Sequence, residues 1–128
     1  MGKPAAKRGD RVFGFDVHLL QFPGVPSPIP IPLPFMGTLS GALSPNVKIE
    51  GKPAAKFGTT VRNTPPHPPV LPYVKPPTNQ GRAFLCSFRV FINMLPAARV
   101  GDLVLTCSDP VDLPLTVVLG RSRVRIGD

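Results

Sequence analysis

The chain has 128 residues, a net charge of +8, nineteen prolines and twelve glycines, so that proline and glycine make up about a quarter of it. Because a proline inside a helix costs about 3 kcal/mol, this composition excludes a helical bundle, a globin fold and a doubly wound sheet. A hydrophobic content of 42% is too high for a disordered linker. We therefore expect one domain of short strands, turns and ordered loops.

The basic charge makes nucleic acids, membrane headgroups and acidic proteins candidate partners. Base stacking would depend on phenylalanine, since the chain has no tryptophan and one tyrosine, Tyr73. The phenylalanines from Phe84 to Phe91 lie in an apolar stretch and are expected in the core. No basic run is longer than two residues, which further weakens the case for nucleic-acid binding.

The first residues, MGKPAAKRGD, are basic but no apolar segment follows them, so a secretory signal is not expected. The apolar segment Leu19–Met36 is too rich in proline to be a membrane-spanning helix. We expect it to be an extended polyproline II segment. Its six prolines are Pro23, Pro26, Pro28, Pro30, Pro32 and Pro34.

A short motif recurs three times along the chain. GKPAAK begins at Gly2 and again at Gly51, and a variant, MLPAARVGD, begins at Met94. These copies divide a single domain, residues 1–128, into repeats of approximately 2–50, 51–93 and 94–128. The repeated residues are Pro4, Ala5 and Ala6; Pro53, Ala54 and Ala55; and Pro96, Ala97, Ala98 and Arg99.

A second repeated element has valine and isoleucine at alternate positions. It occurs at Pro45–Gly51, Phe88–Met94 and Ser122–Asp128. Alternation with a period of two indicates a half-buried strand. Each unit is therefore expected to be a strand, a Pro-Ala-Ala turn and a second strand that begins at the following glycine. The residues expected to pack inside are Val47, Ile49, Val90, Ile92, Val124 and Ile126.

The repeats predict a small all-β fold, a conical pseudo-threefold assembly of β-hairpins with long proline-rich loops. The three motif copies, each with a valine–isoleucine strand, resemble the PAAR-repeat proteins, which are named for a Pro-Ala-Ala-Arg motif. The resemblance covers nearly the whole chain. Only Arg99 keeps the arginine of the motif, since Lys7 and Lys56 stand in the other two copies.

The resemblance implies a structural function, and no enzymatic activity is expected, because both histidines would belong to one metal site. PAAR-repeat proteins cap and sharpen the trimeric β-helical spike of a contractile injection machine, such as a type VI secretion system or a phage-tail-like particle. The implied partners are one spike trimer per copy, effector cargo and, transiently, the target membrane, with no nucleic acid. Such a protein is made in the bacterial cytoplasm, assembled at the tip of the machine and delivered outside or into the target cell. A basic nucleic-acid-binding protein or an adaptor is the alternative.

The resemblance also implies a metal near the apex, typically zinc bound by histidines and a cysteine. His18 and His67 each lie fourteen residues after the proline of their repeat, and Cys107 lies eleven residues after Pro96. Equivalent positions of symmetry-related units meet near the threefold axis. Two imidazoles and a thiolate would then meet in the combination that zinc prefers, so we expect one structural Zn²⁺.

The fourth ligand of this zinc site stays open. Cys86 is the strongest candidate by its chemistry, although its alignment with Leu43 also fits a small buried hydrophobic residue. Asp16, Asp109 or a water molecule are the alternatives. No Ser/His/Asp triad, phosphate-binding loop or supported carboxylate pair points to catalysis.

Overall fold

The computed structural model describes residues 2–127, and its main body is a closed barrel. Six strands form the barrel in the order β10–β11–β2–β3–β6–β7, and every neighbouring pair is antiparallel. The all-β fold class is thus confirmed, and no helix able to span a lipid bilayer occurs among the described residues. The barrel strands are β2 (Arg11–Leu20), β3 (Ile29–Gly41), β6 (Thr60–Arg62), β7 (Gln80–Leu85), β10 (Leu103–Thr106) and β11 (Leu113–Leu119).

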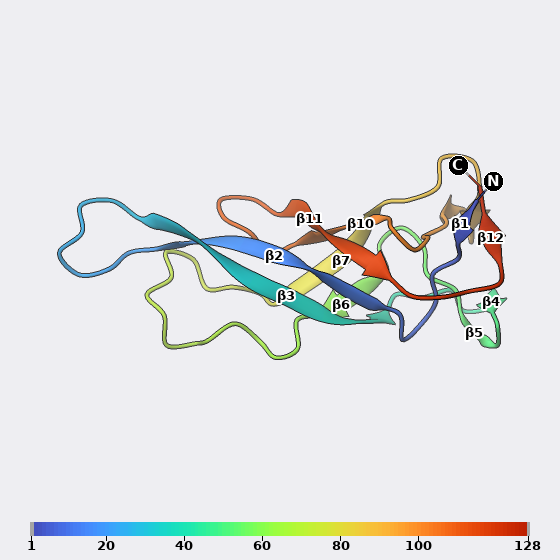
Figure 1. Cartoon of the computed structure of the whole chain (residues 1–128), viewed down its shortest axis with the longest axis horizontal. Helices are drawn as coiled ribbons and strands as arrows, with labels where there is room; N and C mark the ends of the chain where they lie inside the picture. Colours follow the sequence, from blue (N-terminus) through green and yellow to red (C-terminus); the bar gives the residue numbers. More distant parts are fainter. Residues whose placement is uncertain (1, 128) are drawn as a thin grey trace.

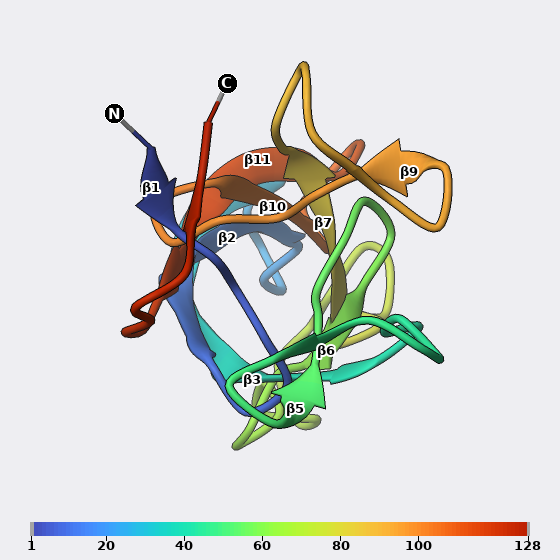
Figure 2. The ribbon, with the colours of Figure 1, turned by 90° about the vertical axis from the view of Figure 1, so that its right-hand side faces the viewer.

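Three short two-stranded ladders surround one end of the barrel. Figure 2 looks onto this end and shows β1, β5 and β9 spaced around the barrel opening. The third ladder joins the two ends of the chain, so the last valine–isoleucine strand completes the first repeat. Asp128, the last residue of that sequence motif, lies outside the described residues. The ladders pair β4 (Lys48–Ile49) with β5 (Lys52–Pro53), β8 (Phe91–Ile92) with β9 (Leu95–Pro96), and β12 (Arg125–Ile126) with β1 (Lys3–Pro4).

The Pro-Ala-Ala segments meet at the centre of this end in a closed ring of backbone hydrogen bonds. The amide of Ala6 donates to the carbonyl of Ala98 (3.0 Å), that of Ala98 to Ala55 (3.1 Å), and that of Ala55 to Ala6 (3.0 Å). All three alanines are buried. Three backbones can approach this closely only with small side chains, which explains the alanines of the motif.

The ladder isoleucines pack under the ring, as the alternation predicted. Ile49, Ile92 and Ile126 form a buried cluster with the first alanine of each motif, and Val47 and Val90 pack partly against it. Val124 is exposed, so its predicted packing inside is wrong. It lies next to the junction of the two chain ends, where its carbonyl accepts the amide of Ala5 (2.8 Å).

The sequence suggested that the chain reverses direction within the Pro-Ala-Ala motif. In the structure it reverses direction just before the motif. The turns lie at Glu50–Gly51 and Asn93–Met94, whose residues all have positive φ. The Pro-Ala-Ala segments have to cross the centre extended, because they bond to the other two copies. Gly9, Gly58 and Gly101, with φ near +90°, lie in the turns that follow the motif, and the barrel strands begin two residues after each glycine.

The polyproline II prediction for Leu19–Met36 is wrong, because this segment contains the end of β2, the hairpin loop 21–28 and the first residues of β3. Strand β2 pairs with β3 without interruption from Arg11–Thr38 to Leu20–Ile29, and this hairpin extends away from the ladders (Figure 1). Prolines 30, 32 and 34 occupy alternate positions of β3. A proline has no amide hydrogen, so these positions suit the edge where β6, which pairs only from Leu39 on, is absent.

The phenylalanines from Phe84 to Phe91 are exposed, although the sequence placed them in the core. Gly81 and Ala83 are the buried residues of β7, so the alternation turns Phe84 outward. Phe88 and Phe91 belong to the β8 region outside the barrel. The barrel core contains mainly smaller side chains, among them Val12, Leu39, Val61, Val104 and Val118, together with Phe35.

The arginine of the third motif closes its turn with a buried ion pair. The Arg99 guanidinium contacts both carboxylate oxygens of Asp102 (Nε 3.1 Å, Nη2 2.9 Å) and donates to the Gly127 carbonyl (3.1 Å). In the second motif the turn is closed by a neutral group, since the amide of Lys56 donates to the Thr59 hydroxyl (2.9 Å). The arginine thus also binds the C-terminal segment.

Replacing Arg99 should therefore destabilise the fold far more than replacing Lys56. Arg99→Ala leaves the buried Asp102 carboxylate with the backbone amide of residue 99 (2.8 Å) and the Lys3 ammonium (3.7 Å), and should lower the free energy of unfolding by about 2–4 kcal/mol. Lys56→Ala should lower it by less than about 1 kcal/mol. Urea unfolding followed by circular dichroism measures both variants, and equal losses would contradict this account.

Candidate metal centre

Four buried side chains gather where β2 runs toward the β2–β3 hairpin turn. Asp16, His18, His67 and Cys107 each offer one ligand atom, and these atoms lie within 4.8 Å of one another. Asp16 and His18 occupy inward-facing positions of β2, two residues apart, so both project to the same side. Cys107 directly follows β10, and His67 lies in the proline-rich loop between β6 and β7.

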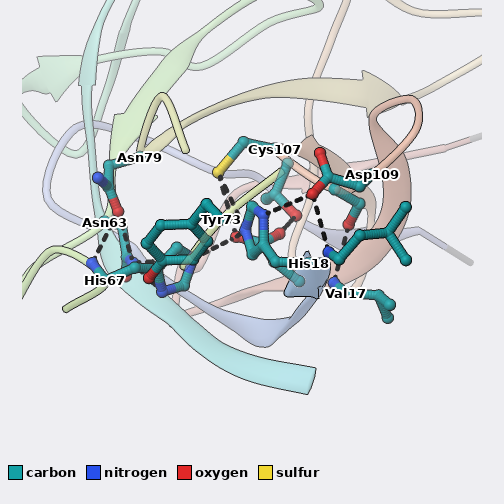
Figure 3. Close-up of polar contacts among 12 residues, drawn as sticks. Val17, His18, Asn63, His67, Tyr73, Asn79, Cys107 and Asp109 are labelled. Atoms are coloured by element: carbon teal, nitrogen blue, oxygen red, sulfur yellow. Dashed lines mark hydrogen bonds and ion pairs between the residues drawn. The ribbon is translucent and has the colours of Figure 1, made fainter. Parts of the chain in front are cut away.

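The structure thus brings together the three side chains that the repeat spacing placed near one point (Figure 3). They come from three segments far apart in the sequence. The loop of His67 lies beside the hairpin and is hydrogen-bonded to it. The amide of Gln21 donates to the Pro72 carbonyl, and the amide of Val74 donates to the Leu19 carbonyl. The pairing of segments, and not local sequence, makes the site.

The distances in the cluster suit a tetrahedral ion. The Asp16 carboxylate oxygen Oδ2 lies 2.8 Å from His67 Nε2, 3.3 Å from Cys107 Sγ and 3.8 Å from His18 Nε2. The His18 nitrogen lies 3.9 Å from the Cys107 sulfur. Ligand atoms 2.0–2.3 Å from one tetrahedral ion lie about 3.3–3.8 Å from each other. The cluster could therefore hold a metal ion after side-chain shifts that bring the four ligand atoms, which all lie within 4.8 Å of one another, into this range.

The fourth member of the cluster is Asp16, one of the alternatives that the sequence left open for the fourth ligand. Cys86 is not part of the group and is buried in the barrel core. Burial raises the pKa of the Cys86 thiol to about 12, with the Asp102 charge adding to the shift and Arg99 opposing it. The thiolate is the form that binds metals, so a thiol with this pKa is a poor ligand at neutral pH.

Asp109, another candidate from the sequence, lies behind His18. Its Oδ2 is 3.5 Å from His18 Nδ1, the ring nitrogen turned away from the cluster, and that nitrogen has no hydrogen bond among the described residues. The amide of Leu19 donates to the same carboxylate oxygen (2.9 Å), and the amide of Asp109 donates to the Val17 carbonyl (2.7 Å). A carboxylate behind a metal-binding histidine is the usual means of orienting the ring.

His67 is held by two asparagines that the sequence analysis missed. The amide of His67 donates to Asn79 Oδ1 (2.8 Å), and the Asn63 side-chain nitrogen lies 3.2 Å from His67 Nδ1. Asn63 also donates to Asn79 Oδ1 (3.2 Å), which ties the two ends of the loop together. Their only sequence signal was their position on either side of the proline-rich loop.

The cluster also shifts the pKa values of its acid and base. Burial raises the pKa of Asp16, but hydrogen bonds from His18, Thr106, His67 and Cys107 outweigh it and lower the pKa overall. Burial lowers the pKa of His18, but its contacts with Asp16 and Cys107 raise it to about 9. Asp16 is therefore ionised at neutral pH, and a metal that binds His18 has to displace a proton.

No protein-family model matches the chain, and no curated protein matches its sequence. The resemblance seen in the repeats therefore stays an expectation. The interpretation of the site depends on the geometry and chemistry of the four side chains.

The raised pKa of His18 predicts the pH dependence of the chelator-treated protein. The stabilisation from protonated His18 is complete below the unfolded-state pKa of 6.5 and is lost as the pH rises through about 9. As the pH is raised from 6.5 to about 9, the urea concentration at the unfolding midpoint should decrease for wild type and decrease less for His18→Gln. A wild-type midpoint that rises over this range would contradict the prediction.

Proposed function

We propose that this protein is a structural tip that caps the trimeric spike of a contractile injection machine. The observation that supports the proposal best is the closed ring of Ala6, Ala55 and Ala98 with three similar ladders around it. A single chain with threefold backbone symmetry at one end matches the end of a trimer. One copy can thus meet three identical chains in equivalent ways.

The ladders also offer the means of attachment. Within residues 2–127 each ladder contains two strands only, so the outer edges of β4, β8 and β12 pair with no further strand. Open edges are a liability on a free monomer, because they expose unpaired backbone groups. Three matching edges on a spike trimer would satisfy them.

The opposite end suits the role of a tip. The molecule is elongated, with the ladders at one end and the β2–β3 hairpin at the other (Figure 1). The candidate metal centre would cross-link β2, the end of β10 and the β6–β7 loop on that side of the barrel. Such an end would contact the target membrane first, and effector cargo would be carried separately.

We propose that the metal is one structural Zn²⁺. Two imidazoles, a thiolate and a carboxylate are ligands that zinc accepts, whereas magnesium and calcium prefer oxygen alone. All four candidate ligands are buried, which is typical of closed structural sites. The ion would supply cross-linking, on the order of 10 kcal/mol of folding free energy, and no catalysis.

Zinc analysis tests the metal proposal. Protein purified without chelator should contain about one zinc per chain, and a variant with His18, His67 and Cys107 all replaced by alanine should contain almost none. Cys86→Ala is the matched control and should keep its zinc, because Cys86 lies outside the cluster. Metal content well under half an equivalent in wild type would refute a resident zinc ion.

Stoichiometry tests the docking proposal. The protein alone should be a monomer, and with the trimeric spike protein from the same genome it should form a complex of one copy to three spike chains. Light scattering coupled to size-exclusion chromatography, or native mass spectrometry, measures this ratio. The complex should persist at high salt, whereas phosphate-mediated nucleic-acid binding weakens steeply with salt. A three-to-three complex, or one abolished by moderate salt, would count against the proposal.

A further inference from the structure

The three ladders share one backbone arrangement but not one surface chemistry. Aligned on the motif prolines, Lys48 of β4 corresponds to Phe91 of β8 and to Arg125 of β12. In the same alignment Lys52 of β5 corresponds to Leu95 of β9 and to Lys3 of β1. All of these side chains are exposed. Two ladders are therefore basic at these positions, and the third is apolar.

Further exposed apolar side chains flank the apolar ladder in the sequence. Phe91 is 57% exposed and Leu95 37%, and their neighbours Phe88 and Met94 are 79% and 92% exposed. Four large apolar side chains this exposed within eight residues are a candidate interaction site. The equivalent positions in the other two ladders carry lysine or arginine, so the apolar residues at Phe91 and Leu95 are not required by the backbone arrangement.

We propose that the β8–β9 ladder is the apolar anchor by which this protein holds the end of the spike trimer, and that the two basic ladders add little affinity. The inference rests on the proposed function, because the anchor is one of the three ladders that form the docking end. It identifies the partner surface as apolar at each of its three equivalent positions.

The threefold symmetry of the partner limits the chemistry of its docking surface. A trimer presents the same chemistry to all three ladders. An acidic surface would suit the basic ladders but would place carboxylates against Phe91 and Leu95. An apolar surface accepts all three, because lysine and arginine can lay their aliphatic stems along it and keep their charges in water.

The direct test gives the β8–β9 ladder the residues of the β4–β5 ladder. In Phe91→Lys/Leu95→Lys both positions carry the lysines found at 48 and 52, so the substituted residues already occur in this backbone arrangement. Dissociation constants for the spike trimer, measured at 0.5 M salt, should rise at least about 30-fold, as expected for loss of a central apolar anchor. Lys48→Ala/Lys52→Ala is the matched control and should change the constant by less than about threefold.

A rescue variant separates lost anchoring from misfolding. Adding Lys48→Phe/Lys52→Leu to the Phe91→Lys/Leu95→Lys protein moves the anchor to the neighbouring ladder. Because a symmetric trimer cannot distinguish the three ladders, binding should recover at least about tenfold. Circular dichroism and the monomeric state of each variant verify the fold.

The outcomes distinguish this inference from the function on which it rests. If wild type binds the trimer and Phe91→Lys/Leu95→Lys binds equally well, the anchor is refuted and the docking stands. A folded rescue variant that fails to recover binding also refutes the anchor. Absence of any wild-type complex overturns the spike-tip function and the anchor together.

Discussion

Three backbone hydrogen bonds among Ala6, Ala55 and Ala98 are the constraint on which the rest of this structure depends. Each alanine uses its amide toward one copy of the motif and its carbonyl toward the other, so the ring closes only when all three copies are present. The same closure requires the two ends of the chain to meet, because the third ladder pairs Lys3–Pro4 with Arg125–Ile126. A motif that looks like a local turn in the sequence is therefore the centre of the whole fold.

The two ends of the molecule are held by different physical means. At the ladder end, small side chains allow backbones to meet directly, and the isoleucines fill the space beneath. Toward the hairpin, the loop of His67 has no strand of its own, and it is held by Asn63, Asn79 and the buried polar cluster around Asp16. A buried carboxylate is tolerated only with several donors, and here two histidines, a threonine and a cysteine contact it. This concentration of donors is also what makes the site suitable for a metal ion.

Backbone symmetry and side-chain asymmetry have separate consequences. The threefold ring needs only alanine and glycine at a few positions, so the exposed faces of the ladders were free to diverge. Two ladders became basic, and the β8–β9 ladder became apolar. The turn that follows the motif is closed by an ion pair in two copies, Lys7 with Asp10 and Arg99 with Asp102, and by the Thr59 hydroxyl in the other. The repeats thus provide a common frame, and the differences between them determine what each corner contacts.

The sequence by itself determined the features that depend on local pattern. Proline content excluded helices, and alternation identified the strands of Ile49, Ile92 and Ile126. Similar offsets from the motif prolines, fourteen, fourteen and eleven residues, pointed to His18, His67 and Cys107 as one group. Tertiary structure decided what depends on pairing partners. Prolines 30, 32 and 34 lie in a strand because one edge of β3 has no neighbour there, and Phe84 faces outward because Ala83 faces the barrel. Asp16 rather than Cys86 joins the cluster because β2 directs the Asp16 side chain inward, on the same side as His18. The spacing of residues in the sequence could not show which of these two buried side chains lies near His18, because that depends on how the strands pair in the barrel.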